Sequence, residues 1–239
     1  MFIADSQIHL WAASTPERPW PAPAPGTPPP HKPFPFTAEY VLAEMDKAGV
    51  SRAVLISPIY EGLRNDVVLE AARRHPQRFA VMARFDPLAE GGRDFLPTWH
   101  AHPGLLGIRF TFHLPAHRHM LVERKLDWLW AQAERLSKPV MLMVHFEDLP
   151  HVAEIAHRHP GLKLTIDHMG LTRGKDAEAL QGFEHLPALA KHPNISVKAS
   201  CMPFHSTEAY PFPALHPYVR QLYDAFGPKR LFWGSDLSR

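Results

Sequence analysis

Short apolar segments recur along this chain, with room for one helix between each and the next. They lie near residues 2–9, 52–57, 79–85, 105–112, 139–145, 162–168, 195–200 and 231–235. The intervening stretches carry apolar side chains at helical spacing, most clearly at 126–137 and 214–226. Strands that alternate with amphipathic helices predict an α/β fold with a parallel sheet. Eight such units favour a (β/α)₈ TIM-like barrel over an open doubly wound sheet.

A His-Pro dipeptide precedes four of the expected strands. The histidines are His75, His102, His159 and His192. Proline cannot continue a helix, and a histidine in the last turn can contact the exposed carbonyl groups there. We therefore expect these histidines to mark helix ends rather than to act as catalysts.

The eighth expected strand is followed by only a few residues. The sequence stops at Arg239, so the eighth helix of a complete barrel is missing from it. We expect the intact protein to continue beyond Arg239 with an amphipathic helix.

Composition narrows the class of protein. The chain has 239 residues and 45% hydrophobic content, which is enough for one core, so we expect a single domain over 1–239. A net charge of +2 argues against nucleic acid and anionic membranes and favours a small-molecule partner. No stretch is long and apolar enough for a membrane span, and the start is not that of a signal peptide, so a cytoplasmic location is expected. The single cysteine, Cys201, fits a reducing compartment.

A proline-rich segment at 16–36 follows the first strand. Its composition favours polyproline II or irregular loop. It is a plain surface loop or a lid over the active-site face, because the loop after the first strand of a barrel lies at that face. A ligand for a proline-recognition domain is a third alternative.

Polar residues gather where the expected strands end, and in a parallel barrel those ends form the active-site face. These residues are Gln7, His9, Arg84, Asp86, Arg109, Thr111, His113, His145, Asp167, His168 and Asp236. Buried charges and imidazoles cost free energy unless they are paired, so packing alone does not explain so many of them.

Four motifs at these strand ends resemble the amidohydrolase superfamily. They are Asp5–Trp11, Gly107–Phe110, Ile166–Gly170 and Trp233–Asp236, in the order and on the strands that the family uses. The most similar branch contains pyrone dicarboxylate lactonase, sugar-lactone hydrolases and aminocarboxymuconate semialdehyde decarboxylase. The resemblance covers the whole chain.

The resemblance implies a metal site that this sequence changes. Family members that bind metal use two histidines of strand one, a histidine of strand five and an aspartate of strand eight. The matching residues are Gln7, His9, His145 and Asp236, and an amide is a poor zinc ligand beside imidazoles. His9, His145 and Asp236 could still hold one zinc or manganese ion, whereas related lactonases work without metal. Both alternatives stay open, as does a purely structural role for His9 and His145; no organic cofactor is expected.

The resemblance also implies catalytic roles. Asp236 would take a proton from the attacking water, and His168 and His9 would polarise the substrate carbonyl, with Gln7 donating a further hydrogen bond. Arg109 is the first candidate to bind a substrate carboxylate, unless it instead pairs with Asp86. His113 and Arg84 are further candidates for substrate binding.

We therefore expect a hydrolase of a small carboxylate-bearing lactone or related ester, with Asp236 as general base. The alternative is a metal-dependent decarboxylase or C–C hydrolase of a cyclic or aromatic acid. A barrel that binds a ligand without catalysis is a third possibility. The sequence leaves a homo-oligomer open.

Overall fold

The computed structural model describes residues 1–23, 27–98 and 102–239. Its eight strands form one sheet in sequence order. This order confirms the predicted α/β fold of the (β/α)₈ TIM-like barrel class. The strands are β1 (Ala4–His9), β2 (Arg52–Ile56), β3 (Phe79–Ala83), β4 (Leu105–Thr111), β5 (Val140–Met143), β6 (Leu164–Ile166), β7 (Ile195–Ser200) and β8 (Leu231–Gly234).

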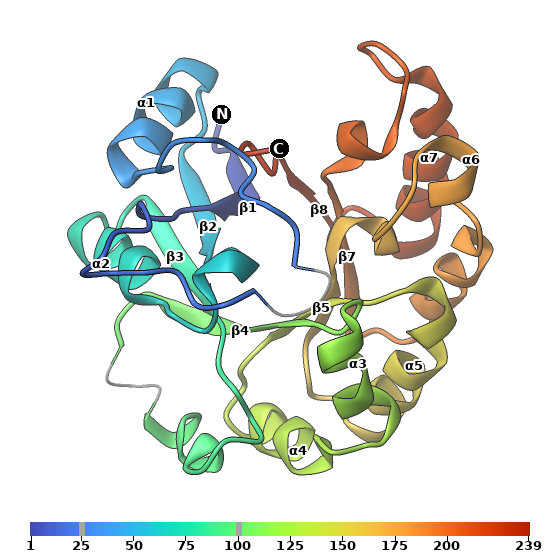
Figure 1. Cartoon of the computed structure of the whole chain (residues 1–239). Helices are drawn as coiled ribbons and strands as arrows, with labels where there is room; N and C mark the ends of the chain where they lie inside the picture. The colour runs from blue at the N-terminus through green and yellow to red at the C-terminus, as the bar shows by residue number, and fades with distance from the viewer. Residues whose placement is uncertain (24–26, 99–101) are drawn as a thin grey trace. The chain divides into compact units, whose positions relative to one another are not determined.

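Seven α-helices are present in the described part of the chain, together with several 3₁₀ turns. They are α1 (Ala38–Ala48), α2 (Asp66–Arg74), α3 (Pro115–Val122), α4 (Asp127–Arg135), α5 (Leu149–Arg158), α6 (Asp176–Ala179) and α7 (His216–Phe226). The chain divides into two compact units (Figure 1). The first unit consists of Met1–Arg109 and Gly234–Arg239, and the second of Phe110–Trp233.

The first unit contains β1, β2, β3 and the helices α1 and α2. Helix α1 begins at Thr37, whose side chain accepts a hydrogen bond from the Tyr40 N–H, and ends at Gly49 in the left-handed region with φ 69°. Its buried side chains include Val41 and Met45, which anchor the helix in the core of this unit. Strand β2 pairs in parallel with both β1 and β3.

Strand β1 contains an irregularity. Its register against β2 shifts between Asp5 and Ile8, so one extra residue is accommodated there. Strict alternation would place Asp5, Gln7 and His9 on one face, and the shift breaks this pattern. Gln7 and His9 still approach each other through their side-chain nitrogens, 3.2 Å apart. Asp5 instead turns its carboxylate to the backbone, where it accepts from the Gln7 N–H at 2.9 Å.

The second unit contains β5, β6 and β7 in parallel register. Helix α4 buries Leu129, Trp130 and Ala133, which are three of the side chains expected on its apolar stripe. Helix α7 ends at Gly227, which has φ 71°.

Three of the four His-Pro sites end helices as expected, whereas residues 99–101, which precede His102, lie outside the described residues. His75 and His159 are the residues that close α2 and α5, each donating its backbone N–H to the last turn. His192 closes the 3₁₀ turn Pro187–Lys191 in the same way.

The proline-rich segment is tied at its base. Trp11 and Phe36 form an antiparallel bridge with two N–H···O=C bonds of 3.2 Å, and their rings stack with centroids 5.0 Å apart. Arg18 binds the buried carboxylate of Glu61 and the exposed carboxylate of Asp66. Residues 24–26 of this segment lie outside the described residues. Its placement over the active-site face stays a prediction.

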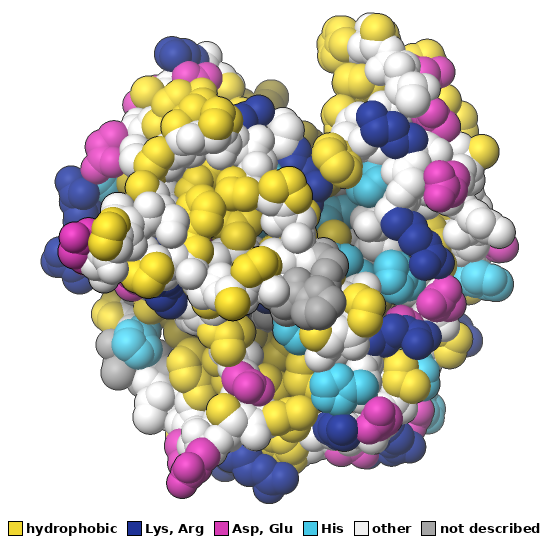
Figure 2. Space-filling view, viewed as in Figure 1, with side chains coloured by type: hydrophobic (Ala, Val, Ile, Leu, Met, Phe, Trp, Pro, Cys, Tyr) yellow, Lys and Arg dark blue, Asp and Glu magenta, His cyan; other side chains and the backbone are white. Residues whose placement is uncertain are grey.

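Apolar side chains are exposed at several places on the surface, and Figure 2 shows one face with many of them. On β8, Phe232 and Trp233 are 39% and 48% exposed. Within 102–239 no α-helix follows this strand. The described ranges hold no helix that is both long and apolar enough to cross a membrane.

Candidate active site

In the first unit, the end of β8 is fastened to β1. The Asp236 backbone N–H donates to the Gln7 carbonyl at 3.0 Å. The Asp5 carboxylate accepts from the Ser235 N–H at 3.0 Å and also from the Ser235 hydroxyl. Asp236 itself has φ 50°, in the left-handed region that aspartate tolerates better than most residues. These bonds fix the Asp236 carboxylate near Gln7 and His9.

The His9 ring has a defined orientation. Its Nδ1 lies 2.8 Å from the Ile56 carbonyl oxygen, which can only accept, so Nδ1 carries the proton and donates. Burial, reinforced by the positive charge of Arg109, holds the pKa of His9 well below its usual value. The ring is therefore neutral at pH 7, and Nε2 carries its lone pair.

The Nε2 atom of His9 faces one hydrogen-bond donor and one hydrogen-bond acceptor. The Gln7 amide nitrogen lies 3.2 Å away and can donate to it. The Asp236 Oδ1 atom lies 3.4 Å away and, like Nε2, is an acceptor. Among the described residues Oδ1 has no hydrogen-bond partner, although Arg239 Nε donates to the other oxygen at 2.9 Å. A proton, a cation or a donor group of a ligand would satisfy the two facing acceptors.

This donor set fits a divalent metal ion in part. An imidazole Nε2 with its Nδ1 bonded to a backbone carbonyl is the usual state of a histidine ligand, and Asp236 adds a carboxylate oxygen. In the second unit both ring nitrogens of His145 are engaged. Nδ1 lies 2.5 Å from the Thr172 hydroxyl and Nε2 lies 3.0 Å from the His113 carbonyl. A ligand role for His145 would require the loss of one of these bonds, so its place in a metal site stays a prediction.

Two buried arginines lie in the first unit. Arg84 and Arg109 are 3% and 5% exposed. Burial and the nearby charge of Arg109 lower the pKa of Arg84 to about 9, and Arg84 Nε donates to the Gly62 carbonyl at 3.2 Å. Arg109 also acts electrostatically on His9. Two like charges held close together in a buried position favour the binding of an anion.

One histidine that the sequence reasoning missed lies beside His9. The His31 ring, from the proline-rich segment, has its centroid 5.6 Å from that of His9. Burial, together with the charge of Arg239, lowers the pKa of His31 to about 4. Asp5 was also missed as a structural residue, because its hydrogen-bond donors come from the bulge in β1 and from Ser235 after β8. The proline content of 16–36 indicates an irregular loop, but no local sequence pattern distinguishes His31.

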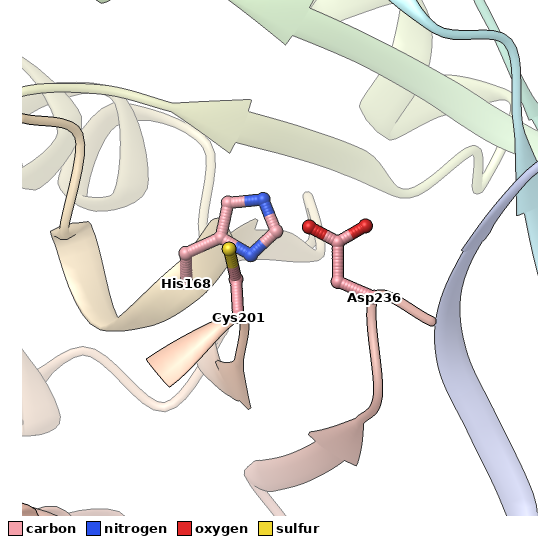
Figure 3. Close-up of side chains that lie close together, drawn as sticks. All are labelled: His168, Cys201 and Asp236. Atoms are coloured by element: carbon pink, nitrogen blue, oxygen red, sulfur yellow. The ribbon is translucent and has the colours of Figure 1, made fainter. Parts of the chain in front are cut away.

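His168 lies in the second unit directly after β6. It has φ 53° and Met169 has φ 55°, so the chain turns through two left-handed residues at the end of the strand. Its Nδ1 lies 2.9 Å from the Ser200 hydroxyl at the end of β7. Cys201, also left-handed, follows Ser200, and the possible ligand atoms of His168 and Cys201 lie within 4.8 Å of each other. Figure 3 shows the sulfur beside the ring.

A buried ion pair lies next to His168 in the chain. Lys198 Nζ is 3.0 Å from Asp167 Oδ1, and both side chains are completely buried. Lys198 also lies 3.4 Å from the Met141 sulfur. This pair joins a residue within β7 to the residue directly after β6, where the turn that carries His168 begins.

The two other predicted residues of β4 and its end have local partners. The Thr111 hydroxyl lies 2.9 Å from His117 Nδ1. The His113 carbonyl accepts from His145, and the two rings are 6.2 Å apart. The predicted role of His113 in substrate binding stays a prediction.

The residues 4–237 match the family model described as amidohydrolase. The chain belongs to the amidohydrolase family. Membership confirms the resemblance seen at the strand ends.

Three known proteins are similar to this amidohydrolase in sequence or in structure. L-fucono-1,5-lactonase of Burkholderia ambifaria is 38% identical over 91 residues, which are 37% of this chain and 30% of that protein. The match therefore spans about a third of the lactonase's length. An amidohydrolase from Burkholderia multivorans with bound zinc superposes with a TM-score of 0.76 at 19% identity, over 99% of this chain and 84% of that one. A probable 2-pyrone-4,6-dicarboxylic acid hydrolase from Acinetobacter baumannii, with citric acid bound, gives 0.70 at 19% identity over the same shares.

Proposed function

We propose that this amidohydrolase hydrolyses a small carboxylate-bearing lactone, with Asp236 as the general base. The observation that carries the proposal is the buried Asp236 Oδ1, which lies 3.4 Å from His9 Nε2 in the same unit as the Arg84 and Arg109 pair. The lactonase and the pyrone dicarboxylic acid hydrolase among the similar proteins support a lactone as the substrate class.

Each residue has a distinct task in this reaction. Arg109 binds the substrate carboxylate, and Arg84 adds a second positive charge. Asp236 accepts a proton as water attacks the lactone carbonyl, and the Gln7 amide donates to the oxygen that becomes negative. The ring C–O bond then breaks, and the leaving oxygen takes the proton from Asp236. The products are a carboxylic acid and an alcohol in one molecule.

A divalent ion is compatible with the same residues. His9 Nε2 and Asp236 Oδ1 would hold it, and when bound it would act as a Lewis acid and lower the pKa of a coordinated water. The zinc in the Burkholderia multivorans amidohydrolase supports this possibility. The steps assigned above to Gln7, Arg109 and Asp236 are needed with or without the ion.

The proposal is tested by assaying ring opening of 2-pyrone-4,6-dicarboxylate and of L-fucono-1,5-lactone in a pH-stat. We expect the carboxylate-bearing lactone to be the better substrate. Asp236→Asn should lower kcat/KM by about 10²-fold or more, since removal of a general base has effects of that order. Equal turnover of a neutral lactone would contradict the substrate class, and full activity of Asp236→Asn would contradict the base.

The alternative, a metal-dependent decarboxylase or C–C hydrolase, predicts a different result. Purified protein would contain zinc or manganese in stoichiometric amount. A cyclic or aromatic acid would lose carbon dioxide or be hydrolysed at a C–C bond, while no lactone is opened. Metal analysis combined with both assays separates the two functions. His168 is a predicted catalytic residue, and the variant His168→Asn is tested in the same two assays.

A further inference from the structure

The proline-rich segment places an unassigned histidine next to the proposed catalytic residues. His31 Nδ1 lies 2.8 Å from the Ser238 hydroxyl. The ring is edge-on to His9 with centroids 5.6 Å apart and an interplanar angle of 72°. All of these residues belong to the first unit. The function proposed above assigns no task to His31.

The hydrogen bond to Ser238 determines which ring nitrogen carries the proton. Ser238 is fully buried, and among the described residues the only hydrogen-bond partner of its hydroxyl group is His31 Nδ1. A buried hydroxyl proton needs an acceptor, and Nδ1 of a neutral imidazole can be one. Ser238 therefore donates to Nδ1, and the ring proton resides on Nε2. His31 is then a hydrogen-bond donor through Nε2.

Aromatic neighbours fix the orientation of the His31 ring. The rings of Trp11 and Tyr60 are nearly perpendicular to it, with centroids 6.3 Å and 6.0 Å away. Edge-to-face contacts of this kind restrict rotation of the ring. The charged groups that act on His31 are Asp236, Arg239, Lys32 and Arg109. The ring is thus placed within the electrostatic reach of the proposed base and of the proposed carboxylate anchor.

We propose that His31 is a catalytic residue that the proline-rich segment supplies. Its Nε2–H donates a hydrogen bond to the carbonyl oxygen of the lactone, on which negative charge develops. His31 does not transfer a proton: the proton of water passes to Asp236 and from there to the leaving oxygen as the C–O bond breaks. A neutral donor aimed at developing charge stabilises the transition state more than the substrate. This inference rests on the proposed lactone hydrolysis.

Two variants of His31 test the donor. His31→Leu removes the N–H, and His31→Gln retains an amide N–H in a similar place. With 2-pyrone-4,6-dicarboxylate we expect His31→Leu to lower kcat by about 10²-fold with little change in KM, as for the loss of one oxyanion donor. His31→Gln should recover most of this loss. His157→Leu, at an exposed position of α5, is the control and should keep full activity.

A second measurement does not depend on turnover. Nitrogen-15 NMR of histidine-labelled protein, assigned with His31→Gln, should show the proton on Nε2 of His31. Ser238→Ala should shift the proton partly to Nδ1 and lower kcat less than His31→Leu does.

Several results would overturn the inference. These are unchanged kcat in a folded His31→Leu variant, a His31→Gln variant as impaired as His31→Leu, or an Nδ1–H ring in the wild type. Loss of bound zinc in His31→Gln would show a ligand role instead. If the wild type opens no lactone, the proposed function fails and the inference fails with it. If the wild type is active and His31→Leu equals it, only the role of His31 is wrong.

Discussion

Asp5 is the residue that holds the proposed catalytic residues in place. Its carboxylate accepts hydrogen bonds from the backbone N–H groups of Gln7 and Ser235 and from the Ser235 hydroxyl. The side chain is buried, so these donors have no access to bulk water. Asp5 thus connects β1 to the residue before Asp236, and its contribution is to geometry rather than to chemistry.

Asp5→Ala should therefore destabilise the protein. Buried donors that lose a charged acceptor cost about 1–3 kcal/mol, and urea unfolding should show this as a lower midpoint with an unchanged slope. Asp224→Ala is the matched control, because this aspartate is exposed on α7 and, among the described residues, pairs only with Arg220 in the preceding turn. The control should change stability by about 0.5 kcal/mol or less. Equal effects of the two substitutions would contradict the role of Asp5.

Arg109 is the residue that should determine the preference for a carboxylate. Arg109→Met should raise KM for 2-pyrone-4,6-dicarboxylate by about 10–100-fold, since a buried charge-assisted pair is lost, while KM for a neutral lactone stays similar. Arg109→Lys should recover only part of the loss, because an ammonium cannot form two parallel hydrogen bonds with a carboxylate. A uniform change for both substrates would show a structural effect.

The sequence identified some site residues and missed others for a physical reason. Gln7, His9 and Asp236 follow from strand ends and family motifs, and they lie together in the first unit. Asp5 depends on a bulge in β1, and His31 depends on the path of a long irregular segment. Neither depends on a local pattern, so neither could be found without the fold.

At the scale of the elements, the strands are where the apolar segments predict them. The predicted and observed bounds of β7 are the same, and β4 differs by one residue at its end. The difference that matters is in β1, where the register shifts between Asp5 and Ile8. Gln7 and His9 stay together there, while the Asp5 carboxylate binds backbone N–H groups. Alternation of side chains is a rule for regular strands and fails at a bulge.

The junction of β6 and β7 contains the completely buried pair Lys198 and Asp167. Lys198→Met should lower the free energy of unfolding by about 3–5 kcal/mol, because it leaves a buried carboxylate without its cation. The double variant Lys198→Met with Asp167→Leu should recover a large part of this loss. Thermal unfolding of both proteins tests the expectation, and a double variant less stable than the single one would contradict it.

At the scale of the whole molecule, acid should weaken the folded state. The pKa of Asp176 is lowered, mainly by its hydrogen bond from the Thr207 hydroxyl, and that of Glu134 by the Gly161 N–H. A carboxyl group whose pKa is lowered in the folded state stabilises that state at pH values above its unfolded pKa of about 4. It loses this contribution as the pH falls through its folded pKa.

Because burial lowers the pKa of His9 and of His31, the urea midpoint should begin to fall as the pH drops below about 6.5, the unfolded value of histidine. The two carboxyl groups should add a further fall below about pH 4. Asp176→Asn should have a lower midpoint at pH 7 and a smaller further fall on acidification. Lys47, which is exposed, provides a control: Lys47→Gln should leave the acid dependence unchanged. An identical acid dependence in Asp176→Asn would contradict the contribution of this residue.

Within the described residues the order of the eight strands could be predicted, because each strand coincides with an apolar segment of the sequence. The contacts between distant strand ends could not be predicted, since they depend on small shifts of register. The family assignment, by contrast, needed only the motifs at those ends, and the match over residues 4–237 confirms it.

The bridge between Trp11 and Phe36 has a consequence for how such a protein can diversify. Because Trp11 and Phe36 meet at one pair of backbone hydrogen bonds, a change of sequence between them can leave both ends of the proline-rich excursion in place. A new sequence grafted between these anchors would bring a different side chain to the position of His31. Strand β1, which carries Gln7, and the residues around Asp236 after β8 would keep their own hydrogen bonds. Substrate preference could then change while this part of the fold stays the same.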